Sequence, residues 1–165
     1  MATPAGRKGA GVVTCVVIPA IDEAESIGPV VTGALARADR VVVADNGSTD
    51  ATATVAAEAG ATVVHEPRRG YGAACLRGIA EALTHCPDVI VFMDGDGSDD
   101  AAQMPRLLEP IRAGEADFVV GSRVRGRAEP GALSVAQRFG NALACTLMRW
   151  VYGARHTDLG PFRAI

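Results

Sequence analysis

Short runs of apolar residues alternate with segments of helical spacing along most of the chain. The apolar runs predict strands at residues 12–18, 40–44, 61–64, 89–93 and 117–120. The segments between them predict helices at about 29–38, 51–59, 71–84 and 105–114, followed by a longer helix at 133–152. These strands show no alternation with polar residues, which is typical of a parallel sheet buried on both faces. The expected fold class is α/β, with a mostly parallel sheet and helices on both faces.

The dipeptide Asn46-Gly47 follows the second predicted strand and allows two interpretations. It is a strong signal for a hairpin turn between two strands. The alanine-rich run behind it favours instead a turn from strand to helix. Ser48 or Thr49 would then be the N-cap of that helix, because a hydroxyl oxygen at this position can accept from the free backbone N–H groups.

The helix predicted at 133–152 also has two interpretations. Leu143, Leu147 and Trp150 follow helical spacing, which favours packing against the sheet. Arginines stand beside Phe139 and Trp150, and this pattern also fits a helix that rests on a membrane surface or meets a partner helix.

Length, charge and cysteine content limit the class of protein. A chain of 165 residues suits one domain, expected at 12–165 behind a flexible N-terminus at 1–11. The formal net charge of −3 gives no general attraction for nucleic acid. The 4 cysteines form no CxxC pair, so we expect small core residues in a reducing compartment. The uncharged stretch 139–148 is shorter than the ~20 residues of a spanning helix, so we expect a cytoplasmic protein, soluble or at the inner face of the membrane.

Four carboxylates follow the buried run at 89–93 within seven residues, namely Asp94, Asp96, Asp99 and Asp100. Such a cluster repels itself unless it is solvated, paired with basic groups or neutralised by a divalent cation. Loops at the carboxyl ends of central strands are where open α/β sheets bind ligands, which favours a site over a merely solvated loop. We expect Asp94 and Asp96 to form the site and Asp99 and Asp100 to start the next helix.

Polar residues also follow the other predicted strands. In a parallel sheet these strand ends share one edge, so the loops are expected to converge. Asp45 and Asn46 could bind a base or ribose, and backbone amides near Gly72 could meet phosphates. The residues after the first four strands are Asp22 and Glu23, Asp45 and Asn46, residues 68–72, and Asp94 to Asp96.

Four motifs in order resemble the nucleotide-sugar domain of family-2 glycosyltransferases, which are inverting enzymes with the GT-A fold. They are VVIPAIDEAESI, VVVADNGSTDAT, RRGYGAACLRGI, and FMDGDGSDD followed by VVGSR. The likeness is greatest to the dolichyl-phosphate mannose synthase and polyprenyl-phosphate sugar transferase branch, and it covers about residues 12–165. Any one motif alone would be weak, but their order makes the resemblance specific.

The resemblance implies a role for each matching residue. Asp94-Gly95-Asp96 matches the DxD motif, whose acids bind ribose and a Mg²⁺ or Mn²⁺ that neutralises the diphosphate leaving group. Arg123 in GSR matches an arginine near the phosphates, and Asp158 is similar to a family acid but is shifted by one residue. The candidate catalytic residues are therefore Asp96, Arg123 and Asp158. The candidate nucleotide-binding residues are Pro19, Asp22, Glu23, Asp45, Asn46, Gly47, Gly70, Gly72, Arg77, Asp94 and Gly95.

The expected function is metal-dependent sugar transfer from a nucleoside-diphosphate sugar to a polyprenyl phosphate or a small hydroxylated acceptor. The sequence departs from the family pattern at Ile21, Asp22 and Asn46, so it does not decide whether the donor carries UDP or GDP. Family members continue beyond Ile165 with most of the acceptor side, so we expect that side to be largely missing here. Apolar surface left exposed would then favour a homodimer. The alternatives are a nucleotide-sugar-binding module without turnover and a sugar nucleotidyltransferase, although the latter would need a basic glycine loop after strand one.

Overall fold

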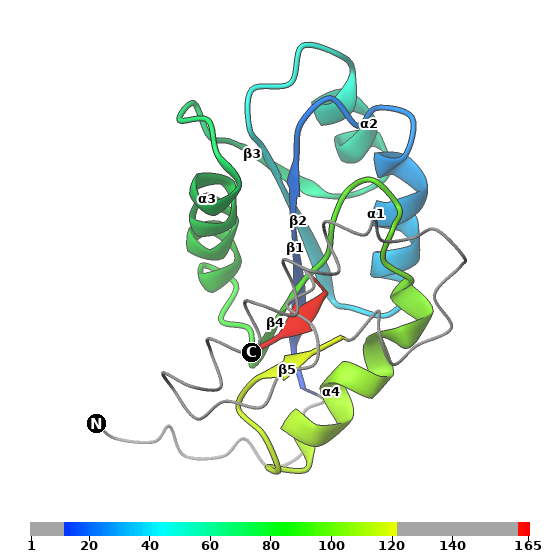
Figure 1. The fold of residues 1–165 in the computed structure, drawn as a ribbon, viewed down its shortest axis with the longest axis vertical. Helices are drawn as coiled ribbons and strands as arrows, with labels where there is room; N and C mark the ends of the chain where they lie inside the picture. The colour runs from blue at the N-terminus through cyan, green and yellow to red at the C-terminus, as the bar shows by residue number, and fades with distance from the viewer. Residues whose placement is uncertain (1–11, 122–161) are drawn as a thin grey trace, which may run out of the picture.

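The computed structural model of the protein describes residues 12–121 and 162–165. Strands and helices alternate along most of these residues, as the hydrophobic pattern predicts (Figure 1). In chain order the elements are β1 (Thr14–Ala20), α1 (Ile27–Leu35), β2 (Arg40–Asp45), α2 (Thr52–Glu58), β3 (Thr62–His65), α3 (Tyr71–Leu83), β4 (Val89–Phe92), a 3₁₀ turn η1 (Ala101–Gln103), α4 (Met104–Arg112), β5 (Val119–Val120) and β6 (Arg163–Ala164).

The strands form one sheet in the order β3-β2-β1-β4-β6-β5. β1 lies near the middle and pairs in parallel with β2 and β4, while β3 pairs in parallel with β2. β6 runs antiparallel to both β4 and β5. The parallel strands therefore end at a common edge, where Ala20, Asp45 and His65 occupy matching register.

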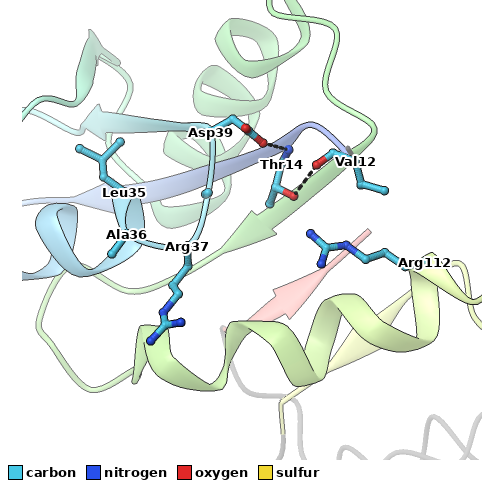
Figure 2. Close-up of a pocket in the computed structure, with 8 residues that line it drawn as sticks. Val12, Thr14, Leu35, Ala36, Arg37, Asp39 and Arg112 are labelled. Carbon is cyan, nitrogen blue, oxygen red and sulfur yellow. Dashed lines mark hydrogen bonds between the residues drawn. The ribbon is translucent and has the colours of Figure 1, made fainter. Parts of the chain in front are cut away.

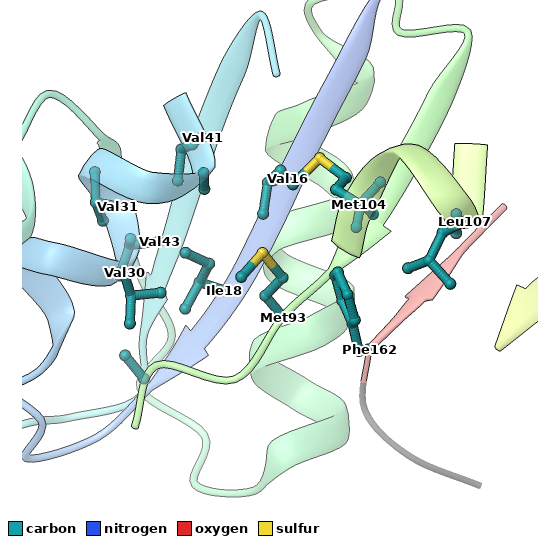
Figure 3. Close-up of a cluster of buried hydrophobic side chains, with 14 of the residues drawn as sticks. Val16, Ile18, Val30, Val31, Val41, Val43, Met93, Met104, Leu107 and Phe162 are labelled. Atoms are coloured by element: carbon teal, nitrogen blue, oxygen red, sulfur yellow. The ribbon is translucent and has the colours of Figure 1, made fainter. Parts of the chain in front are cut away.

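Helices cover both faces of the sheet, with α3 on one side and α1, α2 and α4 on the other (Figure 1). Neighbouring residues of β1 alternate between the two layers. Val16 and Ile18 pack with α1 and α4, whereas Val17 packs with α3. Figure 3 shows the larger cluster, in which Met93, Met104 and Phe162 fill the space between β1, α4 and β6. Burial on both faces explains why these strands show no polar alternation.

Two local features differ from the prediction. β6 was not predicted, because it is only two residues long and follows no apolar run. The N-cap of α2 is Ala51, and neither Ser48 nor Thr49 fills that position. The carboxylate of Asp50 instead accepts from the backbone N–H of Thr52 at 2.9 Å, so an acid one residue before the cap satisfies the first turn.

The other helices and strands lie where they were predicted, with ends shifted by a few residues. α1 begins at Ile27, so Pro29 is its third residue and not its first. The interpretation of Asn46-Gly47 as a strand-to-helix turn is confirmed, because β2 leads into α2 and Gly47 has a φ of 82°. The helix predicted at 133–152 lies outside the described residues.

Candidate functional site

The loops after β1 and β2 are joined by hydrogen bonds at the carboxyl edge of the sheet. The backbone N–H of Asp22 donates to the hydroxyl of Ser48 at 3.0 Å, and Asp22 Oδ1 accepts from the backbone N–H of Thr49 at 2.6 Å. Next along the chain, the N–H of Glu23 donates to the hydroxyl of Thr52 at 2.7 Å. The predicted convergence of these loops is therefore confirmed, and part of the Asp22 carboxylate is used to hold them together.

Asn46 joins the loop after β2 to the loop after β3. Its side-chain amide donates to the carbonyl oxygens of Glu66 and Arg68 at 3.0 and 2.9 Å. Its Oδ1 accepts from the backbone N–H of Gly70 at 2.7 Å. The residue is 6% exposed, so these bonds satisfy a buried amide. Asn46 thus fixes the glycine-rich loop, and its predicted contact with a base or ribose stays a prediction.

Asp45 is the last residue of β2 and presents a buried carboxylate. Its Oδ1 accepts from the backbone N–H of Ser48 at 3.2 Å, and its Oδ2 lies 3.1 Å from Nδ1 of His65. Burial alone would raise the pKa of Asp45, but hydrogen bonds from Ser48 and His65 outweigh burial and lower it. Asp45 is therefore held as a carboxylate that can accept further hydrogen bonds.

Nothing in the sequence pattern marks His65 as a neighbour of Asp45. The parallel register places His65 directly beside Asp45 on the neighbouring strand. The imidazole is 62% exposed, while the Asp45 side chain is 9% exposed. The two residues are 20 positions apart in the chain, so only the register of β2 and β3 could have brought them together.

The acidic loop follows β4 and is folded by its own carboxylates. Asp99 Oδ2 accepts from the backbone N–H of Asp94 at 2.9 Å, and Asp96 Oδ1 accepts from that of Ser98 at 2.8 Å. Asp100 is the N-cap of η1, as expected, but Asp99 bonds back to Asp94 and does not start the helix. Asp94 is half-buried and Asp96 is exposed, so this loop presents its acids to the solvent edge of the sheet.

Glu23 connects the acidic loop with the loop after β1. The hydroxyl of Ser26 in the latter loop donates to the carbonyl oxygen of Gly95 at 2.8 Å. A Cβ on Gly95 would collide with Oε2 of Glu23, so any larger residue there would displace the Glu23 carboxylate from its present position. Oε2 is buried and has no hydrogen-bond partner in the described part of the chain.

The electrostatic environment of Glu23 is unfavourable for a carboxylate. Burial raises its pKa to about 7, and the nearby charges of Asp96, Asp94 and Asp50 act in the same direction. A proton or a cation would relieve this repulsion.

The chemistry of these acids fits a divalent cation that is bound together with a nucleotide. Mg²⁺ is typically held by one or two carboxylates, with phosphate and water oxygens as its remaining ligands. Asp94 and Asp96 could supply such a pair, and the buried oxygen of Glu23 faces the same loop. Within 12–121 and 162–165, no group of three or more His, Cys, Asp or Glu side chains is arranged to hold a metal ion.

The remaining predicted site residues lie in different places. Pro19 is buried in β1. Gly70 and Gly72 are exposed at the start of α3, and a Cβ added to either of them would have no atom within 4 Å. Arg77 lies in the second turn of α3, where it is half-buried. Arg123 and Asp158 lie outside the described residues, so their roles stay predictions.

A separate hollow of about 490 Å³ lies at the opposite edge of the sheet, where β1 begins (Figure 2). Thr14 and Asp39 are among the residues that line it, and the backbone N–H of Thr14 donates to the Asp39 carboxylate at 2.7 Å. The side chains of Arg37 and Arg112 flank it from the ends of α1 and α4. Because the carboxylates lie at the other ends of the strands, this hollow is no part of the candidate site.

The sequence profile of Glycosyl transferase family 2 matches residues 15–163. The chain belongs to this family. It is 39% identical over 160 residues to an uncharacterised glycosyltransferase of Mycobacterium tuberculosis, covering 93% of this chain and 67% of that protein. It is also 40% identical over 116 residues to the undecaprenyl-phosphate mannosyltransferase of Micrococcus luteus, covering 65% of this chain and 46% of that protein.

The fold is shared with family-2 structures. The glucosyl-3-phosphoglycerate synthase of M. tuberculosis, in complex with Mn²⁺, UDP-glucose and phosphoglyceric acid, matches with a TM-score of 0.71 at 26% identity. That match covers 93% of this chain and 56% of the synthase, so the chain spans little more than half of its length. The prediction of a GT-A-like α/β fold in this family is confirmed. Among the described residues, none of the helices has the length and apolar character needed to cross a bilayer.

Proposed function

We propose that the chain binds a nucleoside-diphosphate sugar at the carboxyl edge of its sheet and transfers the sugar to an acceptor with inversion. The observation that carries this proposal is the connected set of loops around Glu23, Asp94 and Asp96. It combines a buried carboxylate oxygen that has no hydrogen-bond partner among the described residues, two further acids, and a glycine beside that oxygen. Acids crowded in this way favour a ligand that brings positive charge.

The nucleotide is proposed to lie over the ends of β1, β2 and β3. Asp45 would accept from an N–H of the base, since its carboxylate is buried, ionised and held by Ser48. Gly70, with a φ of 134°, and Gly72 leave the start of α3 open for a close approach of the phosphates. Both uracil and guanine carry an N–H that suits Asp45, so the donor is proposed as a UDP-glucose or GDP-mannose type of sugar nucleotide.

Asp94 and Asp96 are the residues proposed to hold Mg²⁺ or Mn²⁺. When bound, such an ion stabilises the negative charge that develops on the departing diphosphate. The chain itself supplies a fixed loop for this task, because the Asp99 carboxylate accepts from the backbone N–H of Asp94 and the backbone N–H of Ser98 donates to the Asp96 carboxylate. The synthase complex with Mn²⁺ and UDP-glucose supports a divalent ion at a related site.

The acceptor is proposed to be a polyprenyl phosphate or a small hydroxylated molecule. An acceptor oxygen would form a bond to the anomeric carbon while the bond from that carbon to the diphosphate breaks, and the nucleoside diphosphate would leave with the electron pair. A phosphate oxygen is already anionic, whereas a hydroxyl would need a base to take its proton. Both kinds of acceptor are represented among the relatives. One relative is named for undecaprenyl phosphate, and the synthase structure contains phosphoglyceric acid.

Calorimetry tests the donor side of this proposal. UDP, GDP, UDP-glucose and GDP-mannose are titrated into the chain with and without Mn²⁺. We expect one nucleotide and the corresponding sugar nucleotide to bind, and to do so only in the presence of Mn²⁺. If none of the four binds under either condition, the proposed function is wrong. A transfer assay with the same donors then separates an enzyme from a binding module.

A further inference from the structure

The last residues of β2 and β3 form a pair at the carboxyl edge of the sheet. Asp45 and His65 occupy matching register on these parallel strands, and Nδ1 of His65 lies 3.1 Å from Oδ2 of Asp45. The backbone N–H of Glu66 donates to the carbonyl oxygen of Asp45 at 2.9 Å, which extends the pairing of the two strands past these side chains. The strand register therefore fixes the backbone of both residues and brings their side chains together.

The two side chains have different surroundings. The Asp45 side chain is 9% exposed, whereas the imidazole of His65 is 62% exposed. Burial would raise the pKa of Asp45, but hydrogen bonds from Ser48 and His65 lower it, so the group is a carboxylate. Because a carboxylate can only accept, Nδ1 of His65 must carry the proton of their hydrogen bond. An exposed imidazole thus donates to a buried acid.

The two donors to Asp45 act on different oxygens. The backbone N–H of Ser48 reaches Oδ1 at 3.2 Å, and the imidazole of His65 reaches Oδ2. With one donor alone, the carboxylate could turn about its Cβ–Cγ bond, because torsions of this kind have broad minima. A second donor on the other oxygen fixes the plane of the group. The remaining lone pairs then point in set directions before any ligand binds.

The base of the nucleotide is proposed to lie over these strand ends and to donate an N–H to Asp45. We propose that His65 is a positioning residue for this contact. Its Nδ1–H fixes the plane of the Asp45 carboxylate and so aims the free lone pairs at the N–H of the base. This inference rests on the proposed function and deepens it, because it assigns base recognition to a pair of residues. If His65 only satisfied a buried acid, its loss would not change which bases are bound.

The test measures how strongly nucleotide affinity depends on the N–H of the base. UDP, GDP and their analogues methylated at this nitrogen, 3-methyl-UDP and 1-methyl-GDP, are titrated by calorimetry in the presence of Mn²⁺. His65→Leu removes the donor, whereas His65→Asn keeps an amide nitrogen on Cγ, where Nδ1 is attached in histidine. His85→Leu is the matched control, because it removes an imidazole that lies 3.9 Å from Glu81, beyond the end of α3.

Circular dichroism checks that each variant is folded. If His65→Leu does not fold, His65→Gln takes its place. The amide nitrogen of glutamine is attached one bond further along the side chain than Nδ1, so it does not replace that donor.

For the nucleotide that binds, methylation should weaken the affinity of the unmodified chain by about tenfold or more, because a hydrogen bond to a charged group is lost. His65→Leu should bind the unmethylated nucleotide about fivefold more weakly, and methylation should then cost only about twofold. His65→Asn and His85→Leu should keep the full cost of methylation. An equal cost in His65→Leu and in the unmodified chain would overturn the proposal, and so would a cost in His65→Asn as low as that in His65→Leu.

Failure of this inference is distinguishable from failure of the proposed function. If the unmodified chain binds a nucleotide with Mn²⁺ but methylation of the base costs nothing, the assignment of His65 is wrong and the proposed function stands. If the unmodified chain binds neither nucleotide, the proposed function is wrong and this inference fails with it.

Discussion

The side-chain oxygen of Asn46 accepts a hydrogen bond from the backbone N–H of Gly70 at 2.7 Å, across 24 positions of the chain. Through this bond and two donated by its amide, the loop after β2 holds the glycine-rich loop before α3. The open backbone that is proposed to meet phosphates therefore depends on a buried side chain in a neighbouring loop.

Replacing Asn46 with alanine removes all three bonds at a buried position. Asn46→Ala is expected to lower the free energy of unfolding by about 2 kcal/mol, because backbone groups lose their partners. Urea unfolding measures this change. Gln103→Ala is the control, since that amide is exposed and its loss should cost less than about 0.5 kcal/mol. Equal stability of the two variants would show that the loop does not depend on Asn46.

Gly78 sets how closely α3 packs on the sheet. A Cβ at this position would collide with Cγ1 of Val17 and lie 3.5 Å from Cβ of Ala44. Gly78→Ala is therefore expected to lower the free energy of unfolding by about 1–3 kcal/mol through overpacking. Gly72→Ala is a matched control in the same helix, because nothing lies within 4 Å of its Cβ position. Alanine there should be neutral or stabilise the helix, and a loss as large as that of Gly78→Ala would contradict the packing argument.

Gly95 permits the acidic loop to approach Glu23. A Cβ at Gly95 would push the Glu23 carboxylate away and would also lie 3.2 Å from Cδ1 of Ile27. Since a side chain can move more easily than a backbone, Gly95→Ala is expected to fold but to lose most of its Mn²⁺-dependent nucleotide affinity. Calorimetry with UDP and GDP checks this loss. Gly33→Ala, whose Cβ meets Ala101 at an ordinary 3.6 Å, should bind as the unmodified chain does.

The raised pKa of Glu23 predicts a dependence of stability on pH. The folded chain keeps a proton on Glu23 up to about pH 7, whereas the unfolded chain loses it near the ordinary value of 4.5. Between these values the folded state binds the proton more strongly, so stability should fall as the pH rises and level off above about 7. Urea unfolding without metal at several pH values measures this slope. Glu23→Gln should remove it, and an equal slope in both proteins would contradict the assignment.

The hydrophobic pattern predicted the parallel part of the fold because each of those strands is an apolar run between helical segments. β6 could not be found in this way. Its two residues, Arg163 and Ala164, are too few to show a hydrophobic pattern. Their place between β4 and β5 depends on pairing with strands that are distant in the chain. The likeness to family-2 motifs indicated which acids form the site, and the shared strand edge explained why their loops converge.

The contacts within the site were less predictable than its members. The partner of Asp45 is His65, and the partner of Asn46 is the backbone of residues 66–70, and both depend on the register of β2 and β3. The close approach of Glu23 to Gly95 brings together residues that lie 72 positions apart in the chain, and no local pattern marks it. Such contacts are set by tertiary packing, which a single sequence does not display.

Nucleotide titration of Asp96→Ala tests the central claim most directly. UDP and GDP are titrated by calorimetry into the unmodified chain, into Asp96→Ala and into Asp117→Ala, with and without Mn²⁺. Asp117 is an exposed acid before β5 and serves as the matched control. We predict that Asp96→Ala abolishes Mn²⁺-dependent binding, while Asp117→Ala binds as the unmodified chain does. Unchanged UDP and GDP binding in Asp96→Ala would contradict the claim that the acidic loop holds the nucleotide through a divalent cation.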